Sequence, residues 1–140
     1  MPTRDNDYLG AAGLTTPVSY HVIDPEELAA TPDRPCDRRP VGEAAGLENF
    51  ALNVYTAQPG EEVPLAYHYH DEQEEAFVVL DGTLTVETPE LDYAVEAGET
   101  FVAEPGSPHR AHVPADAPSA ARVVAVGAPA VDDAHPYEDA

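Results

Sequence analysis

The sequence contains no lysine, and its six basic residues are all arginine. Twenty-seven aspartates and glutamates give the chain of 140 residues a formal net charge of −21. Repulsion of this size strains a compact chain unless salt screens it, which favours a protein from a salt-loving cell over an ordinary acidic protein. The same charge repels phosphate backbones and anionic lipids, so we expect neither nucleic acid nor membrane as a partner.

Cysteine and long hydrophobic runs are equally scarce. The single cysteine, Cys36, cannot form an internal disulfide, and a reducing compartment is then the default. No stretch approaches the ~20 apolar residues of a membrane span, and the N-terminus lacks the basic start and apolar run of a signal peptide. We therefore expect a soluble, cytoplasmic protein.

Helical patterns are rare, whereas short strand patterns fill the sequence from Leu47 onward. Short β-favouring runs separated by turn residues predict strands at 49–57, 67–70, 75–80, 83–87, 93–95, 100–102, 109–113 and 122–126. Asp81-Gly82 is a strong hairpin signal because a type I′ turn needs positive φ at both central residues. Many short strands in one domain-sized chain predict an all-β sandwich or jelly-roll barrel.

The two ends of the chain differ from this middle part. We divide the chain into an N-terminal arm (1–45), a barrel (46–128) and an acidic tail (129–140). In the arm, residues 18–23 predict a strand, and Asp24-Pro25 followed by two glutamates is a helix-start signature for residues 26–30. Residues 31–40 hold three prolines and are expected to be irregular, and the tail is expected to be frayed.

Four residues of the predicted barrel are of the types that hold a divalent transition metal. His68 and His70 are two residues apart, so on a strand both imidazoles face the same way. A His-x-His pair alone is more often an exposed strand pair than a metal site. The addition of Glu75 and His109 reverses that preference and favours a metal site with nitrogen and oxygen ligands.

Strand phase separates Glu75 from its acidic neighbours, which otherwise look like solvated surface charge. Glu75 shares its phase with the apolar Phe77 and Val79, so we expect it to face inward and Glu74 to face outward. His112 lies three residues after His109 and is expected on the opposite face. We also expect Arg110 to pair with carboxylates. The segment with Cys36, Arg38 and Arg39 could be a substrate lid, but an ordered arm covering a sheet edge is the better interpretation.

Two segments resemble the paired motifs of the cupin superfamily. Gly60 to Gly82 resembles the first motif, in which a glycine precedes His-x-His, a glutamate and a second glycine. Gly98 to His109 resembles the second, in which a glycine precedes a Pro-Gly turn and a histidine. The resemblance implies a double-stranded β-helix that binds one metal through His68, His70, Glu75 and His109, and it implies a homodimer. The sequence departs from the second motif at Val113, where the family usually has asparagine.

Three imidazoles and one carboxylate suit Fe, Mn, Zn, Ni or Cu, and an octahedral ion would keep two positions for substrate or dioxygen. The first hypothesis is therefore a metal-dependent dioxygenase, or a sugar isomerase or epimerase, that acts on a small polar metabolite. The second is a non-catalytic cupin that binds a small ligand or a metal as a sensor. The third is a structural, salt-adapted barrel. No Ser-His-Asp arrangement, P-loop or dinucleotide fingerprint is present in the sequence.

Overall fold

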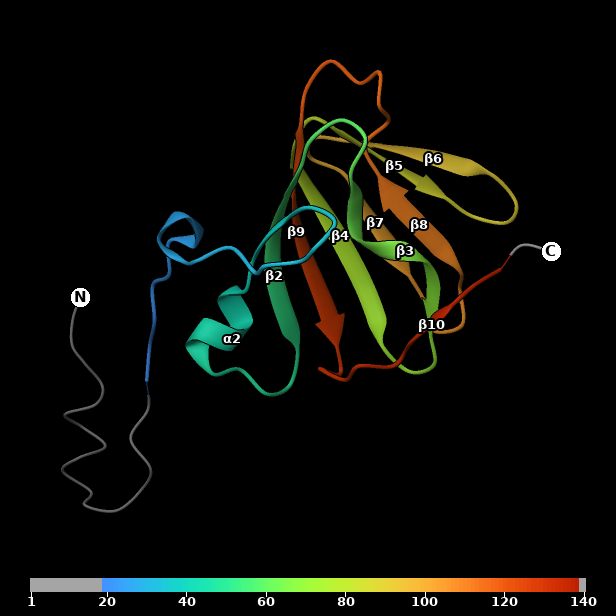
Figure 1. The fold of residues 1–140 in the computed structure, drawn as a ribbon. Coiled ribbons are helices and arrows are strands. Elements are labelled where there is room, and N and C mark those ends of the chain that lie inside the picture. Colours follow the sequence, from blue (N-terminus) through green and yellow to red (C-terminus); the bar gives the residue numbers. More distant parts are fainter. Residues whose placement is uncertain (1–18, 139–140) are drawn as a thin grey trace, which may run out of the picture.

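The computed structural model describes residues 19–138, and its body is two antiparallel five-stranded sheets that form a jelly roll (Figure 1). The strand orders are β1-β2-β9-β4-β7 and β10-β3-β8-β5-β6. The elements are η1 (Pro25–Glu27), β1 (Asp37–Arg39), α2 (Val41–Ala45), β2 (Ala51–Ala57), β3 (Glu62–His70), β4 (Glu74–Asp81), β5 (Thr83–Glu87), β6 (Asp92–Glu96), β7 (Thr100–Ala103), β8 (His109–His112), β9 (Ala121–Ala128) and β10 (Ala134–Pro136). The predicted all-β class is confirmed.

The strands predicted between residues 49 and 126 are all present. The largest difference is at β3, which begins at Glu62 rather than Tyr67 and changes register between Val63 and His68. The hairpin predicted at Asp81-Gly82 is wrong, because β4 and β5 belong to different sheets and do not pair, and Asp81 lacks the positive φ of a type I′ turn. The turn at Gly82, whose φ is 75°, instead carries the chain from one sheet to the other. A Cβ at this position would collide with the backbone carbonyl of Ala120, so both the conformation and the space require glycine.

Inward-facing residues change character along the strands. In β4, Val79 and Phe77 are fully buried, and Glu75 follows them in the same phase. In β2, Ala57 and Tyr55 are followed by Asn53. Strands β2 and β4 both pair with β9, and their polar ends meet the same end of β9, near Gly127. The barrel therefore has an apolar half, which includes Leu84, Val86 and Val113, and a polar half.

The N-terminal arm differs from expectation in three places. Within residues 19–23, the described part of the predicted strand, there is no strand, while residue 18 lies outside the described residues. The predicted helix at 26–30 is a single 3₁₀ turn, η1, capped by the Asp24 side chain. The segment expected to be irregular contains β1, which pairs with β2, and the short helix α2 follows it. The interpretation as an ordered arm at a sheet edge is thus correct.

The expectation of a frayed C-terminal tail is wrong for residues 134–136. These residues form β10, which pairs with the end of β3 that carries His68 and His70. The segment just before β10 is fixed by Gln73, whose side-chain amide donates to the carbonyls of Pro129 and Val131 at 3.0 and 3.3 Å. The tail therefore forms part of the polar half of the barrel.

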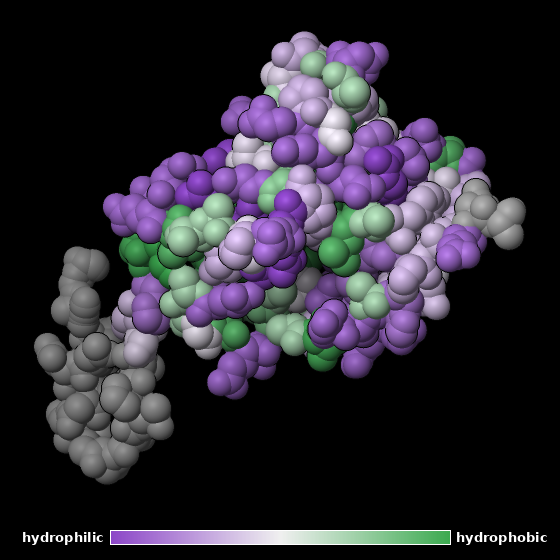
Figure 2. All heavy atoms as spheres, in the orientation of Figure 1, coloured by the Kyte–Doolittle hydropathy of each residue, from purple (hydrophilic) through white to green (hydrophobic). Residues whose placement is uncertain are grey.

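The outer surface is dominated by polar side chains. Figure 2 shows hydrophilic residues over most of the visible face, with hydrophobic residues in small separate groups. Arg110, on β8, pairs as expected with carboxylates, at 2.6 Å from Glu62 and 2.8 Å from Glu87. Among the described residues, no helix is long and apolar enough to cross a membrane.

Candidate metal centre

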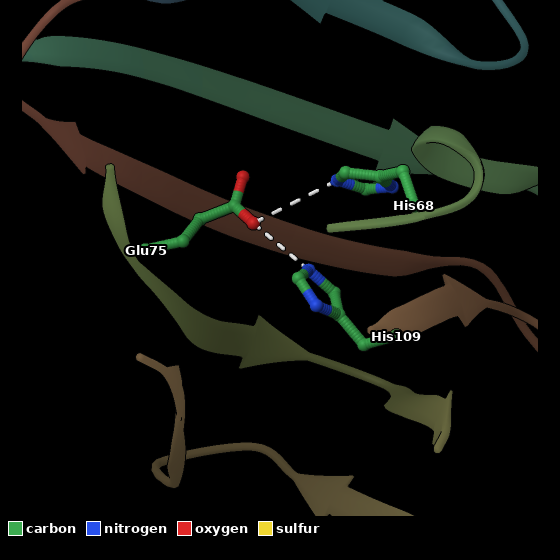
Figure 3. Close-up of side chains that lie close together, drawn as sticks. All are labelled: His68, Glu75 and His109. Atoms are coloured by element: carbon green, nitrogen blue, oxygen red, sulfur yellow. Dashed lines mark hydrogen bonds and ion pairs between the residues drawn. The ribbon is translucent and has the colours of Figure 1, made fainter. Parts of the chain in front are cut away.

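The four candidate ligands come from three strands and are all buried in the polar half. His68 and His70 lie on β3, Glu75 is the second residue of β4, and His109 starts β8. Their exposed fractions are 3, 8, 8 and 1%, respectively. Glu74, by contrast, is exposed, so the phase argument that separated the two glutamates is confirmed. Figure 3 shows His68 and His109 directed at one oxygen of Glu75.

The ligating atoms of these residues converge on the carboxylate of Glu75. Its Oε1 lies 2.9 Å from His109 Nε2, 3.5 Å from His70 Nε2 and 4.0 Å from His68 Nε2. Three ligating atoms, one from each of His68, Glu75 and His109, all lie within 4.8 Å of one another, which is close enough to share an ion. His70 stands outside this group of three but adjoins it through Glu75.

Hydrogen bonds on the far side of each ring fix the tautomers. Nδ1 of His68 lies 2.7 Å from the carbonyl of Ala66, and Nδ1 of His109 lies 2.8 Å from that of Ser107. Nδ1 of His70 lies 2.8 Å from Oδ1 of Asp133. Carbonyl and carboxylate oxygens only accept, so each Nδ1 must carry a proton. In a neutral ring, each Nε2 then presents a lone pair to the centre, as metal ligation requires.

A cation at the centre would complete this arrangement. Nε2 of His68 and of His70 are buried and have no hydrogen-bond partner among residues 19–138. Nε2 of His109 faces a carboxylate oxygen, and two lone pairs at 2.9 Å repel each other unless a proton or a metal ion lies between them. A divalent metal satisfies all three nitrogens and the carboxylate together, so the donor set fits such an ion.

The electrostatics keep the site ready for a metal at neutral pH. Burial alone would raise the pKa of Glu75, but the adjacent imidazoles of His109 and His70 hold it at about 2, so the group is a carboxylate. Burial lowers the pKa of His68, which favours its neutral, ligating form. The carboxylate of Glu75 raises the pKa of His70, and Asp133 adds to this effect. Metal binding at His70 must therefore compete with a proton.

A cavity of about 440 Å³ lies against the centre. His70 and Glu75 belong to its wall, together with Asn53 and Tyr55 of β2 and Arg38 of β1. Its volume lies in the lower part of the usual range of small-molecule sites, roughly 300–1,000 Å³. On another side of the centre, the rings of Phe77 and Phe101 each lie 6.1 Å from that of His109. Phe101 and His109 also line a second cavity of about 610 Å³.

A family comparison now identifies the chain. The family described as the cupin domain matches residues 53–127, more than half of the chain and all four candidate ligands. The protein is a cupin. No functionally curated protein matches it at a significant level.

Several solved structures share the fold of this cupin at low sequence identity. The polyketide cyclase RemF from Streptomyces resistomycificus has a TM-score of 0.72 and 18% identity, with 87% of this chain and 88% of that chain covered. A sugar phosphate isomerase of the cupin superfamily from Silicibacter pomeroyi has a TM-score of 0.65 and 21% identity, with 77% and 75% covered.

A candidate sugar phosphate isomerase from Acidithiobacillus ferrooxidans has a TM-score of 0.60 and 24% identity, with 68% of this chain covered. This cupin spans only 58% of the length of that protein. At these identities, all three likenesses establish the fold alone.

Sequence reasoning missed two groups that belong to this cupin's site. Asp133 lies in the tail that was expected to fray, and nothing in the sequence pairs it with His70. Its carboxylate also accepts the backbone N–H groups of Glu72 and Gln73, at 2.6 and 3.0 Å. Asn53 could have been found, because the phase of the predicted strand 49–57 places it on the same face as Tyr55.

Proposed function

We propose that this cupin is a metal-dependent enzyme that acts on a small polar metabolite. The observation that carries the proposal is that two of the four candidate ligands, His70 and Glu75, form part of the wall of the 440 Å³ cavity. A metal held only for stability would be enclosed by side chains. Here the carboxylate of Glu75 and the imidazole of His70 line a space in which a small molecule fits.

His68, His70, Glu75 and His109 would hold one divalent ion: Fe, Mn, Zn, Ni or Cu. Such an ion supplies either Lewis-acid polarisation of a substrate oxygen or, as iron, activation of dioxygen. The chain's own residues hold the ligands in position. Asp133 orients the imidazole of His70, and the carbonyls of Ala66 and Ser107 orient those of His68 and His109. The fully buried ring of Phe77 packs near His109.

Two reaction classes fit this arrangement: dioxygenation and isomerisation or epimerisation. The similar folds include a sugar phosphate isomerase and a polyketide cyclase, which supports keeping a non-oxidative reaction as a candidate alongside dioxygenation. The two classes differ in whether the reaction consumes dioxygen, which makes them experimentally separable.

The test begins with protein loaded separately with each of the five metals and offered panels of small sugars, hydroxy acids and keto acids. Oxygen consumption by the Fe(II) form would assign dioxygenation, and anaerobic product formation would assign isomerisation. His68→Ala protein should lose either activity. Metal binding without turnover on any substrate would contradict the proposal and favour the non-catalytic sensor.

We also propose a homodimer adapted to salt. The net charge of −21 supports salt adaptation, and the full exposure of Val22 in the N-terminal segment supports pairing, because an apolar side chain left in water favours an interface. In Figure 1 this segment runs beside the barrel rather than into it. Light scattering in molar salt should give twice the chain mass, and a particle of one chain would refute the dimer.

A further inference from the structure

Arg38 is a buried cation in the wall of the cavity that adjoins the metal centre. The residue is 8% exposed and lies on β1, directly opposite Tyr55 of β2. Arg34, which is exposed, lines the same cavity. Two of the six basic side chains of a strongly acidic protein therefore gather at one small cavity, which composition alone does not predict.

The protein does not use all the donors of Arg38. Nη1 donates to Thr31 Oγ1 at 2.8 Å, and Nη2 donates to Glu43 Oε2 at 2.7 Å. Nε is buried and has no hydrogen-bond partner among residues 19–138. The side chain of Tyr55 also interacts with the guanidinium. A buried charged N–H without an acceptor is unfavourable, and because Arg38 lines the cavity, a molecule bound there is placed to supply one.

Glu43 is a weak competitor for this charge. Its side chain is 70% exposed on α2, whereas that of Arg38 is 10% exposed. Ion pairs with one partner in water contribute little because solvent screens them. An anion bound in the cavity would interact with Arg38 at closer to full strength, since both groups would be removed from water.

We propose that the substrate carries a carboxylate that binds Arg38 while an oxygen-bearing group at its other end reaches the metal. This proposal rests on the metal-dependent function proposed above and narrows its substrate to a small hydroxy or keto acid. A planar guanidinium matches a carboxylate in shape and charge. Asn53 offers its buried amide to the part of the substrate in between.

A carboxylate suits this cavity better than a phosphate does. Glu43, Glu75 and Asp132 also line the cavity, and their negative charge repels a dianion more than a monoanion. A phosphate presents three acceptor oxygens, whereas Arg38 has one buried donor atom without a partner. We therefore commit to the carboxylate and make phosphate an outcome of the test.

The probes share one metal-chelating end and differ at the other. Malate, 2-hydroxyglutarate and 2-hydroxyadipate join an α-hydroxy acid to a remote carboxylate at three chain lengths. Their remote monoamides remove the second charge, and 3-phosphoglycerate replaces it with phosphate. Calorimetric titration of the Mn(II)-loaded protein should show that one diacid binds at least about tenfold more tightly than its monoamide.

Four variants assign this preference to Arg38. Arg38→Gln should abolish it, and Arg38→Lys should retain part of it, because charge remains without the planar fork. Arg122→Gln is the matched control: its arginine pairs with Glu26 on the outer surface and should not change the preference. Glu43→Gln should strengthen binding of the diacid, because it removes a competing carboxylate. The gain should be absent when Glu43→Gln is combined with Arg38→Gln, and a gain that persists there would come from the lost charge of Glu43 and count against Arg38 as the binding group.

Each result bears on one proposal. Equal binding of diacid and monoamide at all three lengths, or a preference that survives in Arg38→Gln, would overturn the carboxylate site. A preference for 3-phosphoglycerate that depends on Arg38 would replace it with a phosphate site. If the wild-type protein fails to retain Mn(II), the metal-dependent function fails instead. The same titrations of metal-free protein then test Arg38 alone, by the diacid preference and its loss in Arg38→Gln.

Discussion

The two halves of this barrel share strands β2 and β4 but have opposite interiors. In the apolar half, Leu84, Val86 and Val113 are fully buried and contact other apolar side chains. In the polar half, Glu75, Asn53 and the three histidines are nearly as buried, yet they face a cavity or a centre that a cation would complete. Burial at one end of a strand therefore gives apolar packing, whereas burial at its other end leaves polar groups that lack partners within the protein.

Physical chemistry explains the division. Removing apolar surface from water stabilises the fold by roughly 25 cal/mol per Å², which the apolar half can supply. Burying a polar group without a partner instead costs about 1–3 kcal/mol. The unpartnered Nε2 atoms of His68 and His70 are therefore a cost that the apolar half offsets. We infer that stability resides mainly in one half and function in the other.

The largest effect that separates the halves is expected for Leu84→Ala in β5. The side chain is fully buried, so its truncation leaves a cavity and should lower the free energy of unfolding by about 2–5 kcal/mol. Metal affinity of the folded fraction should not change. Urea denaturation and metal titration measure the two quantities. Leu80→Ala, at an exposed position of β4, is the matched control and should change stability little.

A smaller effect of the opposite kind is expected for Asp133→Asn. The carboxylate holds His70 Nδ1 and two backbone N–H groups, and these hydrogen bonds keep its pKa at about 2 although desolvation acts to raise it. Loss of the charge should weaken metal binding about 10–100-fold, because His70 loses its orienting partner. Competition with a chelator measures this change. Asp132→Asn is the neighbouring control, and equal losses in both variants would argue against the specific role of Asp133.

Most of the barrel could be predicted from the sequence because its strands alternate regularly. Glu75 could be separated from Glu74 in the same way, from phase alone. Arg38 was placed in a proline-rich segment that looked irregular, since a strand as short as β1 leaves no periodic pattern. Asp133 could not be found because its role depends on contacts with residues about 60 positions away. Local patterns do not contain such contacts.

The smallest effect concerns Cys36, which belongs to the apolar core. Burial raises the pKa of its thiol from 9.0 to about 12. In the folded protein the thiol should therefore stay protonated at pH 9–10 and react slowly with iodoacetamide, whereas the unfolded chain reacts quickly. The favourable contribution of this group to stability is complete below pH 9 and is lost as the pH rises toward 12. Equal alkylation rates with and without urea would show that the thiol of Cys36 is accessible to solvent in the folded protein.

The central claim is that the polar half holds a transition metal that the fold does not need. Elemental analysis of protein purified without added metal tests it most directly, with His68→Ala as the comparison, because Nε2 of His68 has no other partner among the described residues. We predict about one transition-metal ion per wild-type chain, almost none in His68→Ala, and similar urea midpoints for the two proteins once metal is removed. Equal metal content in both proteins, or a His68→Ala variant that unfolds outright, would contradict the account.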